Sequence, residues 1–144
     1  SITREKTPEM YKLISMAKTD IRLGVNNGKK AYMRTRPYVH FNESTPLPEE
    51  DRELRYTGSY PSGHSVRGWG IALLLAEINP DRQDAILERG FQYGQSRVIL
   101  GFHYQSDVDA ARFVASAVVA RLHADKKFAR QMKRAKREFA RLSR

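Results

Sequence analysis

Three short clusters of cationic, hydroxyl and imidazole side chains suit the binding of a phosphate group. They are Lys29-x6-Arg36-Pro37, Gly58-Ser59-Tyr60-Pro61-Ser62-Gly63-His64 and Ser96-Arg97-x5-His103-x3-Asp107. A phosphoryl group needs several fixed donors that also stabilise the extra negative charge of its transition state. Arginine offers a planar fork for two oxygens, and lysine offers a compact charge. These clusters therefore predict a phosphate site made by Lys29, Arg36, Ser62, Gly63 and Arg97.

The turn Pro61-Ser62-Gly63-His64 lies where a loop is expected to become a helix. Backbone N–H groups in the first turn of a helix lack intrahelical acceptors, and the helix dipole is positive there, so such a turn attracts anions. Gly63 lets an oxygen approach the backbone closely. Ser62 is placed to cap the helix, to donate to the phosphate, or to do both.

Two histidines suit the two halves of a double displacement. His103 and Asp107 are four residues apart, and a carboxylate on one ring nitrogen leaves the other nitrogen with a lone pair. This pattern predicts His103 as nucleophile, with Asp107 as the residue that orients it. His64, in the other cluster, is then expected to protonate the leaving alkoxide and later to activate water. No step requires a metal ion, so none is expected.

The elements that must position these clusters are all predicted to be helices. A start signal at Thr7-Pro8-Glu9 and a stop signal at Asn26-Asn27-Gly28 bound the first helix. Val39 to Ser59 is expected to be irregular, with its acidic cluster in a solvated loop. Further helices are expected over residues 29–35, 62–78, 81–100, 106–122 and 126–144, with a capping box at Ser106-x-x-Asp109 and no confident strand. The chain is expected to be one all-α domain over residues 1–144, with the apolar helix 62–78 at the centre of a bundle.

The formal charge of +10 belongs almost entirely to the end of the chain. Residues 126–144 hold nine of the 26 basic residues and one of the 16 acidic ones, so residues 1–125 are near balance. Phe128, Met132, Ala135, Phe139 and Leu142 form an apolar stripe on this basic segment. An amphipathic helix packed on the body explains the segment, and a nucleic-acid partner is not expected.

These motifs resemble the signature of the type 2 phosphatidic acid phosphatase superfamily, which also contains the vanadium haloperoxidases. The chain is most similar to the bacterial class A non-specific acid phosphatases. The segment 58–64 carries the fingerprint, and the likeness continues through Leu74-Leu75-Ala76-Glu77-Ile78-Asn79-Pro80 and Gln95-Ser96-Arg97-Val98-Ile99, then along residues 103–112.

The resemblance implies an all-helical, homo-oligomeric, periplasmic or secreted bacterial enzyme that hydrolyses many phosphomonoesters through a phosphohistidine. It implies the roles given above for His64, His103 and Asp107 and for the five phosphate-binding residues. It also implies no cofactor, inhibition by vanadate, molybdate or phosphate at the same site, and, in some members, transfer of the phosphoryl group to alcohols.

The chain departs from the family pattern at two points. Ser65 stands where the fingerprint usually has threonine, a change that keeps the hydroxyl. The family also carries a helical region before the matched part, so the chain is expected to lack that N-terminal region, which contributes to the rim of the pocket.

Three other functions compete with this interpretation. A vanadate-dependent haloperoxidase would bind vanadate at the same predicted phosphate site, with His103 as the vanadate ligand. A membrane lipid phosphatase would need spanning helices, and the sequence has no apolar stretch of that length. A nucleic-acid binder would use the basic segment 126–144, with affinity that falls steeply with salt.

Overall fold

Helices make up all the regular structure of residues 1–143, the part of the chain that the computed structural model describes. They are α1 (Pro8–Tyr32), α2 (Pro37–His40), α3 (Pro48–Leu54), α4 (Gly63–Ile78), the 3-10 turn η1 (Pro80–Arg82), α5 (Gln83–Ile99), α6 (Gln105–His123) and α7 (Lys126–Leu142). The prediction of an all-α fold is confirmed. Within residues 1–143 there is no helix with the length and apolar character needed to cross a membrane.

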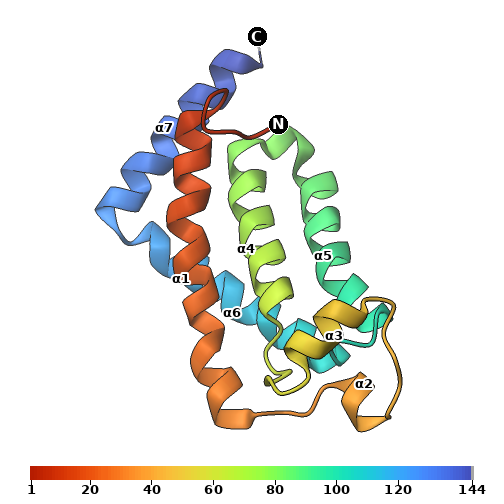
Figure 1. The fold of residues 1–144 in the computed structure, drawn as a ribbon. Coiled ribbons are helices and arrows are strands. Elements are labelled where there is room, and N and C mark those ends of the chain that lie inside the picture. Colours follow the sequence, from red (N-terminus) through yellow and green to blue (C-terminus); the bar gives the residue numbers. More distant parts are fainter. Residues whose placement is uncertain (144) are drawn as a thin grey trace.

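Helix α4 lies at the centre of the bundle, as its apolar character predicted. It packs against α1, α5, α6 and α7, and Val66 and Leu74 on it are fully buried. Figure 1 shows α1 and α5 on either side of α4, with α7 beside the upper part of α1. Helices α4 and α5 approach closely because Gly90 has no side chain, since a Cβ there would lie 2.4 Å from the Cβ of Ala72.

The first helix is longer than predicted. It continues through Asn26-Asn27-Gly28 to Tyr32, so the stop signal and the separate helix 29–35 were wrong. Gly28 does not end the helix. It allows Pro61 to approach closely, because a Cβ at this position would lie 2.8 Å from the Pro61 ring. The helix stops instead at Met33, which has a left-handed backbone with φ of 41°.

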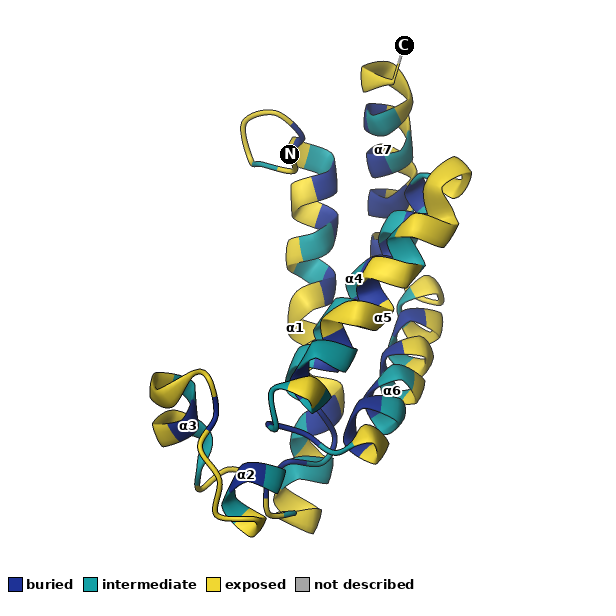
Figure 2. Ribbon diagram, turned by 90° about the vertical axis from the view of Figure 1, so that its right-hand side faces the viewer, coloured by how far each residue is buried: buried dark blue, intermediate teal, exposed yellow. Residues whose placement is uncertain are grey.

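Two short helices occupy the region after α1. Residues 39–59 were predicted to be irregular, but α3 forms there, and α2 precedes it. The signals for α3 were present, because Pro48 takes the first helical position and Glu49, Glu50 and Asp51 fill the first turn. Figure 2 shows α2 and α3 at the lower end of the molecule, with α3 largely exposed.

Helix α6 begins one residue earlier than predicted, and with a different cap. Tyr104 is the N-cap residue, and its N–H donates to Oδ2 of Asp107 over 2.9 Å. The predicted capping box at Ser106 and Asp109 was therefore wrong. The carboxylate assigned to orient His103 also closes the first turn of its own helix.

Helix α7 packs on α1 through both apolar and polar contacts. Phe128, Met132 and Ala135 are buried as predicted, whereas Leu142 is exposed. Glu138 is also buried, and its carboxylate accepts the N–H groups of Glu9 and Met10 at the start of α1. Arg144, the last residue of the predicted tail helix, lies outside the described residues.

Candidate active site

The three clusters meet at one end of the bundle, where α1 and α5 end and α4 and α6 begin (Figure 1). The backbone itself joins them. The N–H of Ser62 donates to the carbonyl of Asp107, and the N–H of His103 donates to the carbonyl of Arg97. The N–H of Ser59 donates to the carbonyl of Arg34, which lies just after α1. Segments far apart in the sequence are thus held side by side.

His103 is buried, and both of its ring nitrogens have polar neighbours. Nδ1 lies 3.2 Å from Oγ of Ser59 and 3.4 Å from Oδ2 of Asp107. Nε2 lies 3.2 Å from Nη1 of Arg36. The hydroxyl of Ser59 donates to Oδ2 of Asp107 over 2.5 Å, so Ser59 lies between the carboxylate and the imidazole.

These contacts define the tautomer of His103. A guanidinium can only donate, so Nε2, which faces Arg36, must carry the lone pair. The single hydroxyl hydrogen of Ser59 is directed to Asp107, so the Ser59 oxygen accepts from Nδ1–H. The imidazole is therefore neutral, with its proton on Nδ1 and its basic nitrogen on the side of the cations.

Asp107 is fully buried and accepts hydrogen bonds from several directions. Besides Ser59 and the N–H of Tyr104, Nη1 of Arg34 donates to Oδ1 over 2.8 Å. Arg34 also lies over the ring of Tyr104, at 4.0 Å from its centroid. Burial by itself raises the pKa of Asp107, but the hydrogen bonds from His103, Ser59 and Tyr104 outweigh it, and the pKa is lowered. The carboxylate therefore stays ionised beside His103.

Arg36 is buried between the site and the segment that carries α3. Each of the five N–H bonds of its guanidinium has an acceptor within 3.2 Å. The acceptors are the carbonyls of Leu54, Phe102 and Gly58, the hydroxyl of Thr57 and Nε2 of His103. A phosphate can reach this guanidinium only by exchange with one of them.

Lys29, Ser62 and Gly63 meet at the start of α4. The Lys29 ammonium donates to the carbonyl of Gly58 over 2.8 Å, and its Cε lies 3.7 Å from the place where a Cβ of Gly63 would stand. Burial and the charge of Arg36, opposed by Asp107, lower the pKa of Lys29 to about 8. The buried hydroxyl of Ser62 accepts the N–H of Ser65, so it caps α4 in this structure.

His64 occupies the first turn of α4 and is half-buried. Its ring lies 6.2 Å from that of Tyr93. Burial, with the charges of Arg97 and Arg67, lowers the pKa of His64 to about 4, while Glu50 acts in the opposite direction. The pKa of His103 is also lowered to about 4, chiefly by burial. Both imidazoles are therefore neutral near pH 7.

Arg97 is buried at the end of α5 and has an unexpected partner. Nη2 donates to Oε2 of Glu50, from α3, over 2.6 Å. The guanidinium lies over the ring of Phe102, at 4.2 Å from its centroid. Nε is buried and has no hydrogen-bond partner among the described residues. This buried donor is therefore an unsatisfied polar group inside a cationic cluster.

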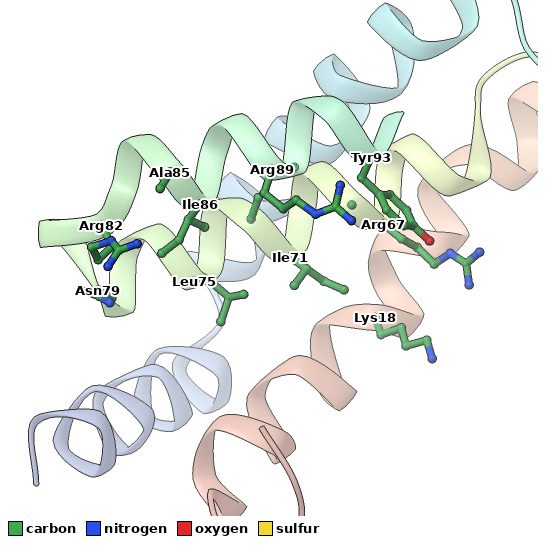
Figure 3. A pocket seen from close by; sticks show the side chains of 13 residues that line it. Lys18, Arg67, Ile71, Leu75, Asn79, Arg82, Ala85, Ile86, Arg89 and Tyr93 are labelled. Carbon is green, nitrogen blue, oxygen red and sulfur yellow. The ribbon is translucent and has the colours of Figure 1, made fainter. Parts of the chain in front are cut away.

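A groove between α1, α4 and α5 begins beside His64. It has a volume of about 720 Å³. Figure 3 shows Tyr93 and Arg67 at one end and Asn79 and Arg82 at the other, with Ile71, Leu75 and Ile86 between them. Four basic side chains line its edges: Lys18, Arg67, Arg82 and Arg89. The groove is apolar along its floor and positively charged along its rim.

Ser59, Arg34 and Glu50 contact the predicted site residues, although none of the three was predicted to belong to the site. Ser59 lies inside the fingerprint, so its position was a usable signal. Arg34 and Glu50 lie in segments predicted as a helix and as a solvated loop, and nothing in their local sequence connects them to Asp107 or Arg97. Among residues 1–143 no three His, Cys, Asp or Glu side chains are grouped so that they could hold a metal ion.

Comparison with known proteins identifies the family. Residues 11–130 match the PAP2 superfamily. A non-specific acid phosphatase of Providencia stuartii is 49% identical over 142 residues, which cover 98% of this chain and 57% of that protein. One from Salmonella typhimurium is 43% identical and covers 95% and 55%, respectively. An acid phosphatase of Zymomonas mobilis is 41% identical and covers 91% and 50%.

The chain thus spans about half the length of the curated relatives it matches. The part that matches the family contains all three clusters and every helix that positions them, apart from the first residues of α1 and most of α7. The chain belongs to the PAP2 superfamily.

Proposed function

We propose that the protein hydrolyses phosphomonoesters by double displacement through a phosphohistidine on His103. The observation that carries the proposal is the buried imidazole whose Nδ1 faces Ser59 and Asp107 and whose Nε2 lone pair faces Arg36. A neutral, oriented imidazole among fixed cations suits nucleophilic attack on a phosphoryl group. Relatives that bear the name acid phosphatase support this choice over a haloperoxidase.

In the first half-reaction, Nε2 of His103 attacks phosphorus and forms the P–N bond while the bond to the leaving oxygen breaks. The electron pair goes to that oxygen, which takes a proton from His64. Ser59 and Asp107 hold the Nδ1 proton and stabilise the imidazolium that forms. Lys29, Arg36 and Arg97, with the N–H groups that begin α4, bind the three remaining oxygens.

In the second half-reaction, water attacks phosphorus and gives a proton to His64. The P–N bond breaks, its electron pair returns to Nε2, and phosphate leaves. The same residues hold the phosphoryl oxygens in both halves. An alcohol in place of water gives transfer of the phosphoryl group instead of hydrolysis. No step uses a metal ion or a cofactor.

His64 needs the substrate in order to serve as a proton donor. The protein groups around His64 lower its pKa to about 4, which leaves it neutral near pH 7. A phosphate dianion brought between Arg97 and His64 introduces a negative charge that favours the imidazolium. Binding and protonation are therefore coupled, which suits activity at acidic pH.

The groove beside His64 suits the alcohol part of the substrate. It starts at Tyr93 and Arg67, on the side from which His64 would protonate the leaving oxygen. Its apolar floor can accept leaving groups of several shapes. We also propose a periplasmic or secreted location and a homo-oligomer, in line with the family resemblance.

Trapping of the intermediate tests the mechanism. We expect a chemically quenched reaction with a radiolabelled aryl phosphate to yield an acid-labile phosphoprotein with the wild-type chain and none with His103→Asn. His123→Asn is the matched control, because that histidine lies at the far end of α6, paired with Glu77. A phosphoprotein that persists in His103→Asn would refute the nucleophile assignment.

A further inference from the structure

The contact between Glu50 and Arg97 joins one residue of the phosphate site to one outside it. Arg97 is a phosphate-binding residue in the proposed function, yet in this structure its Nη2 donates to a carboxylate oxygen at 2.6 Å. Hydrogen bonding to Arg97 lowers the pKa of Glu50, so the carboxylate is ionised. An anionic group of the protein therefore lies where an anionic ligand is expected to bind.

The two partners differ in how freely they can move. The side chain of Arg97 is 6% exposed and lies against Phe102, whereas that of Glu50 is 37% exposed. Glu50 can turn toward solvent with little loss of packing, whereas Arg97 would lose its contact with the Phe102 ring. If the pair separates, Glu50 is the residue that moves.

Helix α3, which presents Glu50, is attached to the molecule by polar contacts. The hydroxyl of Tyr38 donates to the carbonyl of Asp51, and Nε of Arg36 donates to the carbonyl of Leu54. Asp51 is its one buried residue. Figure 2 shows α3 away from the packed helices, with exposed residues along it. A helix held in this way can shift without opening the core.

We propose that Glu50 is a positioning residue of the phosphate site, whose carboxylate holds Arg97 while the site is empty and is exchanged for a phosphate oxygen when the substrate binds. This inference rests on the proposed function. An arginine fork pairs with carboxylate and phosphate in the same geometry, so one acceptor can replace the other.

The exchange has a consequence for turnover. The return of Glu50 to Arg97 competes with bound phosphate, so it weakens retention of the product. Removal of the carboxylate should therefore strengthen the binding of inorganic phosphate. A residue with a merely structural role would have the opposite effect, because its loss disturbs the site and weakens binding.

Glu50 also affects the proton donor. The charged groups that face His64 are Arg97 on α5, Arg67 on its own helix, Arg36 before α2, and Glu50 on α3. The three arginines lower the pKa of His64, and Glu50 raises it. Loss of the carboxylate is expected to move the ionisation of His64 to lower pH, in addition to its effect on phosphate binding.

Calorimetric titration with inorganic phosphate tests the inference. We expect Glu50→Gln to bind phosphate about two- to fivefold more tightly than the wild-type chain, which is the size of effect typical of a partly exposed ion pair. Glu49→Gln is the matched control, because it removes the same charge from the same turn of α3 at an exposed position. Its affinity should equal that of the wild type. Circular dichroism checks that both variants are folded.

Equal or weaker phosphate binding by Glu50→Gln overturns the inference, and so does equal tightening in Glu49→Gln. Hydrolysis assays separate this result from the proposed function. If Glu50→Gln binds phosphate no better than the wild type, but the wild type and Glu50→Gln both hydrolyse an aryl phosphate, only the exchange is refuted. If Glu50→Gln binds phosphate more tightly than the wild type, but neither the wild type nor Glu50→Gln hydrolyses the ester, the exchange stands and the proposed catalysis fails.

Discussion

The two sides of the proposed phosphate site differ in how fully their polar atoms are paired. On the α6 side, His103, Ser59 and Asp107 are buried and bonded to one another, and Arg34 and the N–H of Tyr104 complete the partners of Asp107. On the α5 side, among residues 1–143, Arg97 has one side-chain partner, the partly exposed Glu50, and its buried Nε has none.

The contrast separates two tasks that one site must perform. A nucleophile benefits from a geometry that does not change during the reaction, because reorganisation adds to the barrier. An anion-binding arginine must exchange partners each time a ligand enters or leaves. Changes on the α6 side should therefore lower the rate, and changes on the α5 side should alter binding and its dependence on pH.

The largest effect is expected from Asp107→Asn. An amide would direct N–H groups toward donors such as Arg34 and lose the charge that stabilises the imidazolium. We expect kcat to fall by about 10³-fold or more, by analogy with other carboxylates that orient a catalytic histidine. Asp109→Asn, two residues later on the same helix, is the control. Steady-state assays in which Asp107→Asn stays within tenfold of wild type would contradict the assignment.

Acid should destabilise the empty protein through His103. Its pKa of about 4 in the folded state is below the ordinary value of 6.5, so between these values the unfolded chain binds more protons and stability is lost as the pH falls. The loss from His103 approaches about 3 kcal/mol. Urea unfolding of wild type and His103→Asn between pH 7 and 4.5 measures it. Parallel curves for the two proteins would show that His103 is not the cause.

Ser59→Ala tests whether the bridge between Asp107 and His103 is needed. Without the hydroxyl, Nδ1 faces the carboxylate across 3.4 Å, and the ring is less firmly held. We expect kcat to fall about 10- to 30-fold with KM nearly unchanged, the loss typical of one buried hydrogen bond. Ser106→Ala, which removes an exposed hydroxyl bonded to Arg34, should have little effect. A large rise in KM for Ser59→Ala would show that this residue contributes to substrate binding and not to the rate of the chemical step.

The smallest effect is expected on the coupling between protons and phosphate. In the proposed mechanism bound phosphate raises the pKa of His64 from about 4, so affinity should increase as the pH falls from 7 to 5.5. Phosphate itself gains a proton in this range, so the comparison is with His64→Asn, whose increase should be about two- to fivefold smaller. Calorimetry in two buffers of different ionisation enthalpy counts the protons. Equal proton uptake by both proteins would remove His64 from the coupling.

The three clusters that the structure brings together could be recognised from residue types and spacing. The chemistry of a phosphate ligand demands cations, a helix start and an imidazole with a carboxylate, and these are local patterns. Ser59, Arg34 and Glu50 could not be assigned because their partners lie 44 or more residues away along the chain. The cap of α6 was misplaced for a related reason, since Asp107 caps its helix and contacts His103 with the same oxygen.

The fold was predicted well where one local signal dominates and less well where tertiary contacts override it. The apolar α4 and the apolar stripe of α7 followed from hydrophobic pattern alone. Asn26-Asn27-Gly28 reads as a helix end, but α1 continues because Gly28 lets Pro61 pack against it. The proline and acidic residues that start α3 are visible in the sequence. The helix was still missed, because α3 lies outside the packed core and has no apolar pattern of the kind that predicted the other helices.

By itself, the sequence determined the all-helical class, the location of the net charge near the end of the chain and the residue types whose chemistry suits the binding and attack of a phosphate. These depend on composition and on spacing within a turn or two. Only the tertiary structure decided which nitrogen of His103 is free, which donors Asp107 accepts and which carboxylate faces Arg97. Those properties depend on hydrogen bonds between segments far apart in the chain, which no local pattern encodes.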